Sequence, residues 1–262
     1  MKLEINDESV YCYTNNREID PAKESVFFIH GSGMDHTVWT LASRHFARHG
    51  RNVVTVDLPG HGRSSGPLRP SIEAMSDWII EVMNALGIAK AAITGHSMGS
   101  LVALDCAARH ADRVRAIALV GTTAPMPVSD AILEAAKADD HAAFDMLTQW
   151  GYSKRHLYGG NRNSGIWMVG NTLRLYERGG PGVLYNDMNA CNEYTAGLER
   201  APQVQCPALM VLGEEDRLTP TRGTGPLQEA LANAQVVVLP GAGHSIMIEE
   251  PNALLDALHK VL

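Results

Sequence analysis

The stretch Gly95-His96-Ser97-Met98-Gly99 decides the fold of this chain. It follows a short strand-like run at 91–94 and opens a helix-like run at 100–109. A Gly-x-Ser-x-Gly stretch between a strand and a helix predicts a sharp turn that lifts the serine hydroxyl clear of the sheet. Side chains two residues before and after the serine would collide in such a turn, so glycine is needed at both places. Because the flanking pattern matches as well as the motif, Ser97 is predicted to be a catalytic nucleophile rather than part of a flexible turn.

Strand-like and helix-like segments alternate on both sides of this turn. Segments 3–6 and 10–15 are predicted to form an opening antiparallel pair. Continuous apolar runs are typical of strands buried on both faces of a parallel sheet, and such runs lie at 26–29, 53–56, 116–120, 208–212 and 236–239. Helices are predicted at 38–49, at 72–86 between a Ser71 cap and Gly87, and from Pro251 onward. This alternation predicts an α/β fold.

The alternation breaks between about residues 123 and 205. Strand signals vanish there, and Gly-rich or Asn-rich joints separate predicted helices at 129–137, 142–150, 166–177 and 183–198. We therefore expect an α/β core made of residues 1–122 and 206–262, with residues 123–205 as a helical insertion. A helical block at the strand ends of an open parallel sheet is predicted to be a lid over a ligand site. The alternative is an insertion that only stabilises the core.

Two later loops supply the groups that make a serine reactive. A serine hydroxyl is a poor nucleophile until a base takes its proton, and an acidic residue must orient that base. Asp216 and His244 each follow the end of an apolar run, as Ser97 does. The carboxyl ends of parallel strands open on one edge of the sheet, so the three side chains are predicted to converge there. Glu214 and Glu215 are rival carboxylates in the Asp216 loop.

Further motifs lie around these residues. They are His30-Gly31-Ser32-Gly33, Asp57-Leu58-Pro59-Gly60-His61-Gly62-Arg63-Ser64, the Ser97 turn, the Asp216 loop and Gly241-Ala242-Gly243-His244. Together they resemble the serine-nucleophile branch of the α/β-hydrolase superfamily over nearly the whole chain apart from the insertion. The chain is similar to small bacterial esterases, 3-oxoadipate enol-lactonases and carbon–carbon bond hydrolases. The resemblance implies an α/β-hydrolase fold, with an eight-stranded, mostly parallel sheet, flanking helices and a helical cap inserted after the sixth strand.

The resemblance also implies roles for individual residues. Ser97 would be the nucleophile, His244 the general base and acid, and Asp216 the residue that holds the imidazole. The family pattern Gly-x-x-Asp-x-x-x-Pro selects Asp216 over its two glutamate neighbours. An oxyanion hole needs two N–H donors where negative charge develops, and the matching backbone amides are those of Ser32 and Met98.

The predicted function is a serine hydrolase that cleaves a small carboxylic ester or lactone through a Ser-His-Asp triad and an acyl-enzyme intermediate. Three alternatives stay open. They are a carbon–carbon bond hydrolase that uses the same triad on a dienol acid of the meta-cleavage type, an acyltransferase or perhydrolase, and a catalytically silent ligand-binding protein. His96 precedes the serine, as in many esterases and enol-lactonases, whereas carbon–carbon bond hydrolases more often resemble a pattern with asparagine there.

The insertion is predicted to set substrate choice. Its aromatic and methionine candidates for an apolar substrate pocket are Trp150, Tyr152, Trp167, Met168, Tyr185 and Met188. On helices such side chains are more often ordinary core. Its candidates for binding a substrate carboxylate are Arg155, Arg162, Arg174 and Arg178, although solvated helix faces account for most arginines.

Composition narrows the classes of partner. The 262 residues carry a formal net charge of -7, which argues against nucleic acid because phosphate binding needs a basic surface. Neither a membrane-crossing run nor a signal peptide is evident, so we expect no membrane partner and a cytoplasmic location. The four cysteines are scattered and the histidines lack ligand spacing, so we expect free thiols, no metal and no cofactor. The expected partner is a small-molecule ester, lactone or related acyl substrate, and the oligomeric state is open.

Overall fold

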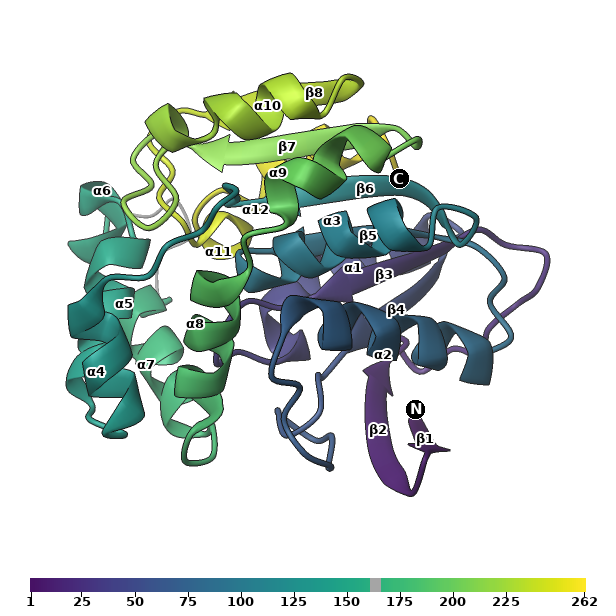
Figure 1. Cartoon of the computed structure of the whole chain (residues 1–262), viewed down its shortest axis with the longest axis horizontal. Coiled ribbons are helices and arrows are strands. Elements are labelled where there is room, and N and C mark those ends of the chain that lie inside the picture. The colour runs from purple at the N-terminus through teal and green to yellow at the C-terminus, as the bar shows by residue number, and fades with distance from the viewer. Residues whose placement is uncertain (161–165) are drawn as a thin grey trace.

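The computed structural model describes residues 1–160 and 166–262, which contain an eight-stranded sheet (Figure 1). The strands are β1 (Lys2–Ile5), β2 (Glu8–Tyr13), β3 (Ser25–Ile29), β4 (Asn52–Val56), β5 (Ala91–His96), β6 (Val114–Val120), β7 (Ala208–Gly213) and β8 (Ala234–Leu239). Their order across the sheet is β1-β2-β4-β3-β5-β6-β7-β8. The pairs β1–β2 and β2–β4 are antiparallel, and all other neighbours are parallel. The expected eight-stranded, mostly parallel sheet is confirmed.

Helices cover both faces of this sheet. In Figure 1, α2 (Ile72–Ala85) and α3 (Met98–Arg109) lie on one face, and α1 (Thr40–Arg48) and α12 (Pro251–Leu258) lie on the other. Each face holds its own apolar cluster, one around Trp78 and Leu101 and the other around Trp39 and Phe46. Strands β3, β4, β5 and β7 are buried at every residue. Burial on both faces explains why their sequences are continuous apolar runs.

Local signals set the bounds of several helices. The Ser71 hydroxyl accepts a hydrogen bond from the Ala74 N–H at 3.2 Å and so caps α2. Gly87, just beyond α2, has a φ of 67°, which favours glycine. The helix expected at 38–49 is a 3-10 turn, η1 (His36–Trp39), followed by α1. The remaining short elements of the core are η3 (Thr221–Gly223), α10 (Gly225–Ala230) and α11 (Ile246–Glu249). Across the described residues, no helix has both the length and the apolar character needed to cross a membrane.

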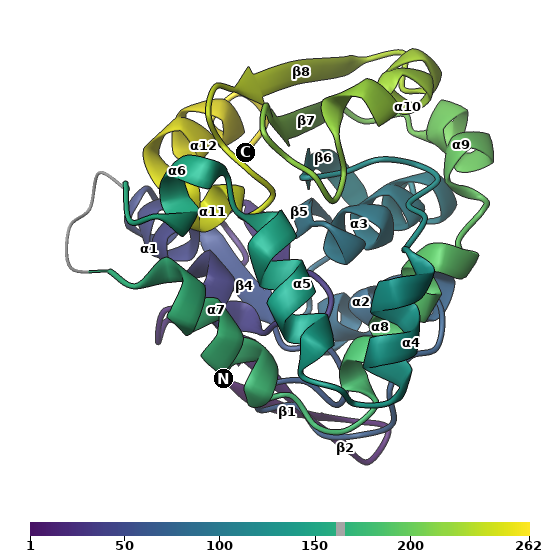
Figure 2. The same cartoon turned by 90° about the vertical axis from the view of Figure 1, so that its left-hand side faces the viewer.

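A block of helices, here called the helical insertion, separates β6 from β7. It comprises α4 (Asp130–Lys137), α5 (Ala142–Gly151), α6 (Lys154–Leu157), α7 (Met168–Glu177), α8 (Val183–Glu193), α9 (Gly197–Arg200) and the 3-10 turn η2 (Ala201–Gln203). Figures 1 and 2 show α4, α5, α7 and α8 together at the end of the sheet toward which the arrowhead of β7 points. The insertion therefore lies at the carboxyl ends of the parallel strands, next to the turn of Ser97.

The helix expected at 183–198 is two helices in the structure. Helix α8 ends at Glu193 and α9 begins at Gly197. Between them, the Tyr194 hydroxyl donates to Asp105 Oδ1 in α3 at 3.1 Å. A Cβ at Gly197 would lie 2.9 Å from the Ala124 Cβ. These contacts hold the chain against the core and interrupt the helix. The spacing of apolar residues within the segment does not predict them, because their partners lie elsewhere in the sequence.

The four cysteines are free thiols, as their spacing predicts. Cys12, Cys106 and Cys191 are buried, whereas Cys206 is half-buried. Burial raises the pKa of each of the three buried thiols to about 12. They are therefore protonated and unreactive at neutral pH.

Candidate active site

Ser97 lies on the sharp turn between β5 and α3. Its backbone has a φ of 52° and a ψ of −118°, a conformation that strains any residue other than glycine. A Cβ at Gly95 would lie 1.8 Å from the carbonyl oxygen of Gly99, and a Cβ at Gly99 would lie 2.6 Å from that of His30. No side chain fits at either glycine, which is the physical reason for the Gly-x-Ser-x-Gly pattern. The turn leaves Ser97 half-buried at the wall of a cavity.

Asp216 and His244 meet at this edge of the sheet. The loops after β7 and β8 bring Asp216 Oδ2 within 2.7 Å of His244 Nδ1. The carboxylate also accepts the N–H groups of Leu218 and Thr219, each at 2.8 Å, and the Thr219 hydroxyl at 2.7 Å. Burial by itself would raise the pKa of Asp216, but His244 and these hydrogen bonds outweigh it and lower the pKa to about 2. Asp216 is therefore ionised at neutral pH and holds the imidazole by one ring nitrogen.

The two rival carboxylates contact other groups. Glu214 Oε2 accepts the N–H of Gly241 at 2.9 Å, and Glu215 Oε2 accepts the N–H of Lys154 at 3.3 Å. Both glutamates are exposed. Of the three acidic residues in this loop, Asp216 is the one that contacts the imidazole of His244.

Ser97 and His244 line the same cavity, which has a volume of ≈ 170 Å³. The His244 ring packs against Gly121, where a Cβ would lie 3.1 Å from its Cε1, and its centroid is 4.7 Å from that of His96. Within the described part of the chain, neither Ser97 Oγ nor His244 Nε2 has a hydrogen-bond partner. Both atoms are thus free to contact a bound molecule, and catalytic hydrogen bonds often tighten only when substrate is bound.

Two further side chains hold the backbone that carries His244. Glu249 accepts the N–H of Gly243 at 3.0 Å and that of Ser245 at 3.1 Å, on either side of His244. His96 Nε2 donates to the carbonyl oxygen of His244 at 3.0 Å. Burial lowers the pKa of His96 to about 3, so its ring is neutral. Glu249 was missed in the sequence analysis. The one feature that could have indicated its role is that an acidic residue follows three apolar residues in the short helix α11.

The loop after β3 lies against the turn of Ser97. A Cβ at Gly31 would lie 3.3 Å from the Ser97 Cβ and 2.8 Å from His96 Nδ1. The next residue, Ser32, lines the cavity. Among the described residues, no atom accepts a hydrogen bond from the backbone N–H of Ser32 or of Met98. Two unpaired donors beside a half-buried serine suit a negative charge that develops there.

The Alpha/beta hydrolase family matches residues 26–257 of the chain. The chain belongs to this family. The resemblance inferred from its motifs is thereby confirmed.

Several relatives of this hydrolase are themselves hydrolases. The (E)-2-((N-methylformamido)methylene)succinate hydrolase of Acinetobacter baylyi is 22% identical over 242 residues, covering 90% of this chain and 89% of the relative. The pimeloyl-(acyl-carrier protein) methyl ester esterase of Chromobacterium violaceum is 29% identical over 251 residues, covering 89% and 92%. Among solved structures, the enol-lactonase from Burkholderia xenovorans LB400 shares the fold with a TM-score of 0.86 at 21% identity, covering 100% and 99% of the two chains. The expectation that the chain is an α/β-fold hydrolase enzyme is confirmed.

The cavity of the hydrolase is mostly apolar. The helical insertion and the segment leading into it supply Met126, Pro127, Val128, Ile132, Leu147, Trp150, Met188 and Cys191. Of the predicted pocket residues, Trp150 and Met188 are therefore at the cavity. Sequence reasoning missed the aliphatic residues because it weighed aromatic and methionine side chains. An inward Ile or Leu on a helix gives the same signal whether it packs in a core or lines a cavity.

The other four predicted pocket residues do not line this cavity, and the expected pocket is corrected accordingly. Tyr152 is wholly buried, and its hydroxyl lies 2.7 Å from Thr172 Oγ1, the polar partner that a buried tyrosine needs. Trp167 is 68% exposed. Met168 lines a separate hollow between α7, η1 and α11. Tyr185 is half-buried against the apolar cluster of the α1 and α12 face.

The candidate arginines also lie elsewhere. Arg155, Arg174 and Arg178 bind other groups of the protein, and none of them lines the cavity. Arg162 lies outside the described residues. The arginine that does line the cavity is Arg217, whose guanidinium already donates to two backbone carbonyl oxygens.

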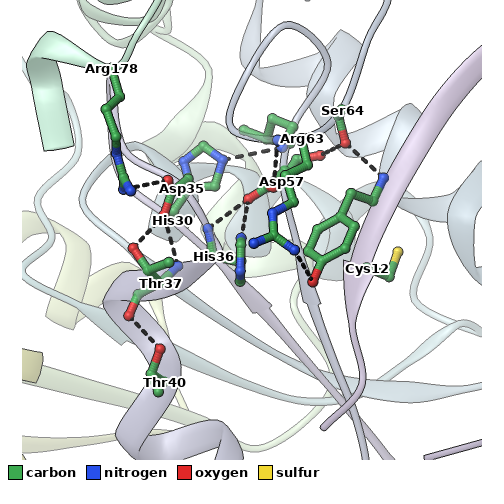
Figure 3. Close-up of polar contacts among 12 residues, drawn as sticks. Cys12, His30, Asp35, His36, Thr37, Thr40, Asp57, Arg63, Ser64 and Arg178 are labelled. Atoms are coloured by element: carbon green, nitrogen blue, oxygen red, sulfur yellow. Dashed lines mark hydrogen bonds and ion pairs between the residues drawn. The ribbon is translucent and has the colours of Figure 1, made fainter. Parts of the chain in front are cut away.

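One group of side chains has the spacing of a metal site. Within residues 1–160 and 166–262, it is Asp35, His36 and Asp57, whose ligand atoms lie within 4.8 Å of one another. Protein donors already bind these atoms (Figure 3). Asp57 Oδ1 accepts hydrogen bonds from the backbone N–H of His36 at 2.7 Å and from the ring Nδ1 of His36 at 2.8 Å. Asp57 Oδ2 accepts the backbone N–H of Arg63 at 2.9 Å. Asp35 forms an ion pair with Arg178. These contacts fit a structural hydrogen-bond centre, and the absence of a metal stays a prediction.

Proposed function

We propose that this chain is a serine hydrolase that cleaves a small carboxylic ester or lactone. The observation that carries the proposal is the 2.7 Å contact between Asp216 Oδ2 and His244 Nδ1, beside the cavity that His244 shares with Ser97. An imidazole oriented by an ionised carboxylate can take the proton of a serine hydroxyl as that oxygen attacks a carbonyl carbon. The chemistry therefore needs no group beyond those that the described residues supply at this cavity.

The first half of the reaction acylates the serine. Ser97 Oγ bonds to the substrate carbonyl carbon while its proton passes to His244 Nε2. The backbone N–H groups of Ser32 and Met98 stabilise the negative oxygen of the tetrahedral intermediate. His244 then gives the proton to the leaving alkoxide, the ester bond breaks, and an acyl group stays on Ser97.

The second half returns the free enzyme. A water molecule enters the site vacated by the alcohol and attacks the acyl carbon while His244 takes one of its protons. The same two backbone amides stabilise the second oxyanion. Collapse of this intermediate breaks the bond to Ser97 Oγ, which recovers its proton from His244, and the carboxylic acid leaves. For a lactone, the alcohol and the acid are two ends of one product.

The cavity favours a short, uncharged acyl group. Its ≈ 170 Å³ is close to the volume of an engineered apolar cavity, about 150 Å³, that binds benzene. By that proportion it holds roughly seven non-hydrogen atoms. Its lining is mainly apolar, and Arg217, the cation that the described lining contains, is engaged by backbone carbonyls. This mainly apolar lining favours a simple ester or lactone over a dienol acid, although Arg217 keeps its positive charge at the cavity.

The helical insertion acts as a cap in this proposal. Residues 123–205 would form the cap, and residues 1–122 and 206–262 the catalytic core. The position of the insertion at the carboxyl ends of the strands and its share of the cavity lining support this division. The relatives that act on a methyl ester and on an enol-lactone support the choice of bond.

The test uses 4-nitrophenyl esters of acetate, butyrate and octanoate. We expect turnover by the unmodified enzyme and a loss of at least three orders of magnitude, roughly, in Ser97→Ala. Asp216→Asn should lose about 10³- to 10⁴-fold. The matched control is Glu215→Gln, which changes an exposed carboxylate of the same loop and should keep full activity. Unchanged turnover in Ser97→Ala, or equal effects of the two loop variants, would refute the proposal.

A further inference from the structure

Asp187 is a buried carboxylate that belongs to the helical insertion but binds the core. It lies on α8 and its relative exposure is 0%. Its Oδ2 accepts the backbone N–H of Gly33 at 2.8 Å and contacts His61 Nε2 at 2.8 Å. Its Oδ1 accepts the side-chain amide of Asn186 at 3.1 Å. A carboxylate so deeply buried is stabilised only by such partners, so these contacts hold α8 and the core loop in one arrangement.

The group that Asp187 binds is next to a proposed oxyanion donor. Gly33 directly follows Ser32, whose N–H has no acceptor among the described residues. Gly33 has a φ of 65°, and a Cβ there would lie 3.0 Å from Leu184 Cδ1 and 3.2 Å from Tyr176 Cδ1. The loop is therefore bent into a conformation that favours glycine and is pressed against α8 and α7. Its hydrogen bond to Asp187 fixes the direction of the adjoining peptide units.

His61 makes the carboxylate a paired charge. Its Nδ1 lies 3.0 Å from the carbonyl oxygen of Pro59 and its Nε2 lies 2.8 Å from Asp187 Oδ2. Both neighbours are acceptors, so both ring nitrogens must carry hydrogen, as in an imidazolium. Burial opposes that charge, but the carboxylate outweighs it and raises the pKa of His61. The pair therefore ties three segments together, namely α8, the Gly33 loop and the turn that carries His61.

Helix α8 also shapes the cavity. Met188, the residue after Asp187, and Cys191, one turn further on, both line it. Cys191 Sγ lies 3.8 Å from Ser32 Oγ. One helix thus contacts the acyl cavity with one part of its surface and the loop of the proposed oxyanion donor with another.

We infer that Asp187, held by His61, is a positioning residue for the oxyanion hole: it fixes the Gly33 peptide so that the Ser32 N–H faces the carbonyl oxygen of the substrate. The inference rests on the proposed serine-hydrolase function. It assigns the helical insertion a second task besides enclosing the substrate, because the donor loop belongs to the core but one of its anchors belongs to the insertion.

The test compares Asp187→Ala with Asp105→Asn. Asp105 is a matched control because it is also a fully buried carboxylate that joins the core to the insertion, through Tyr194 and Arg200, but it contacts neither the Gly33 loop nor the cavity. Three quantities are measured below the unfolding temperature of each variant. The first is kcat/KM for 4-nitrophenyl butyrate. The second is the affinity for the trifluoromethyl ketone analogue of butyric acid, which forms an oxyanion on Ser97. The third is the affinity for the N-methyl amide of butyric acid, which forms no oxyanion.

For Asp187→Ala we expect kcat/KM and the affinity for the ketone to fall together by about 10- to 100-fold, part of the 10²- to 10³-fold effect of deleting an oxyanion donor. The affinity for the amide should change less than threefold, and Asp105→Asn should leave all three values within about threefold. If Asp187→Ala does not fold, His61→Gln removes the same ion pair and should give a smaller loss of the same pattern. Equal losses for ketone and amide, or unchanged kcat/KM, would overturn the inference.

Two further readouts separate this inference from the proposed function. Hydrogen exchange in the peptide 30–34 should speed up in Asp187→Ala but not in Asp105→Asn, and unchanged exchange would overturn the positioning role. A fluorophosphonate should label Ser97 in the unmodified enzyme. Absence of both labelling and turnover there would refute the serine-hydrolase proposal and the role of Asp187 with it, whereas labelling with normal activity in Asp187→Ala refutes the role of Asp187 alone.

Discussion

Replacing Ile132 with alanine should lengthen the acyl chain that the enzyme prefers. Ile132 lies on α4, is 4% exposed and lines the cavity beside Ser97. The cavity of ≈ 170 Å³ matches an acyl group of roughly seven non-hydrogen atoms, so the unmodified enzyme should favour chains of about six carbons or fewer. The substitution removes three side-chain carbons from the wall and leaves room for about two more methylene groups on the substrate.

The size of the effect follows from the free energy of burying those methylene groups. Each is worth about 0.8 kcal/mol, so two give about 1.6 kcal/mol, or about 15-fold in relative kcat/KM. The assay measures kcat/KM for 4-nitrophenyl esters with even-numbered acyl chains from acetate to decanoate. In Ile132→Ala the peak of this series should move by about two carbons. Because losing a buried isoleucine costs about 2 to 5 kcal/mol of stability, rates are measured well below the unfolding midpoint of the variant.

The matched control is Leu133→Ala. Leu133 is the next residue of the same helix and is half-buried against the apolar cluster, but it does not line the cavity. This variant should lose stability without a change in chain-length preference. A peak at the same chain length in Ile132→Ala, or the same shift in both variants, would refute the assignment of this cavity as the acyl site.

Two further predictions concern folding. Gly95→Ala should abolish the folded state, because its Cβ would lie 1.8 Å from a backbone oxygen. Gly225→Ala should fold normally, because a Cβ at Gly225 would have no atom outside its own turn within 4 Å. Circular dichroism and the yield of folded protein compare the two variants, and a folded, active Gly95→Ala would contradict the packing argument. Stability should also depend on pH through the His61–Asp187 pair. Despite burial, each partner favours the charged form of the other, so the pKa of His61 is raised above 6.5 and that of Asp187 is lowered below 3.8. The stability that protonated His61 contributes is complete below about pH 6.5 and is lost as the pH rises through the raised pKa of His61. The stability that ionised Asp187 contributes is present above about pH 3.8 and is lost as the pH falls through the lowered pKa of Asp187. Urea unfolding should therefore show lower stability at pH 9 than at pH 6, with a smaller difference in His61→Gln, and identical differences would argue against a charged pair.

Much of the core could be predicted because its signals are local. The apolar runs of the buried strands, the caps of α2 and the glycines around Ser97 each report a constraint that acts within a few residues. The loops that carry Asp216 and His244 follow predicted strands, and parallel strands place their carboxyl ends on one edge. Their convergence therefore follows from the topology without any knowledge of side-chain packing.

The cavity wall could not be predicted in this way. Tyr152 and Leu147 lie five residues apart, yet Leu147 lines the cavity and Tyr152 is buried beside Thr172. Which of them faces Ser97 depends on how α5 and α7 dock over the strand ends, and a helical period cannot report that. The break between α8 and α9 has the same origin, since contacts with α3 and with the segment after β6 produce it.

The sequence by itself determined the order of strands and helices, the strained turn at Ser97 and the identity of the residues that could meet there, because backbone sterics and apolar periodicity act over short distances. Only the tertiary structure decided which side chains enclose the cavity and that Asp187 reaches His61 across 126 residues of sequence. Those outcomes depend on contacts between segments that are distant in the sequence, and these contacts form only when the insertion packs on the core.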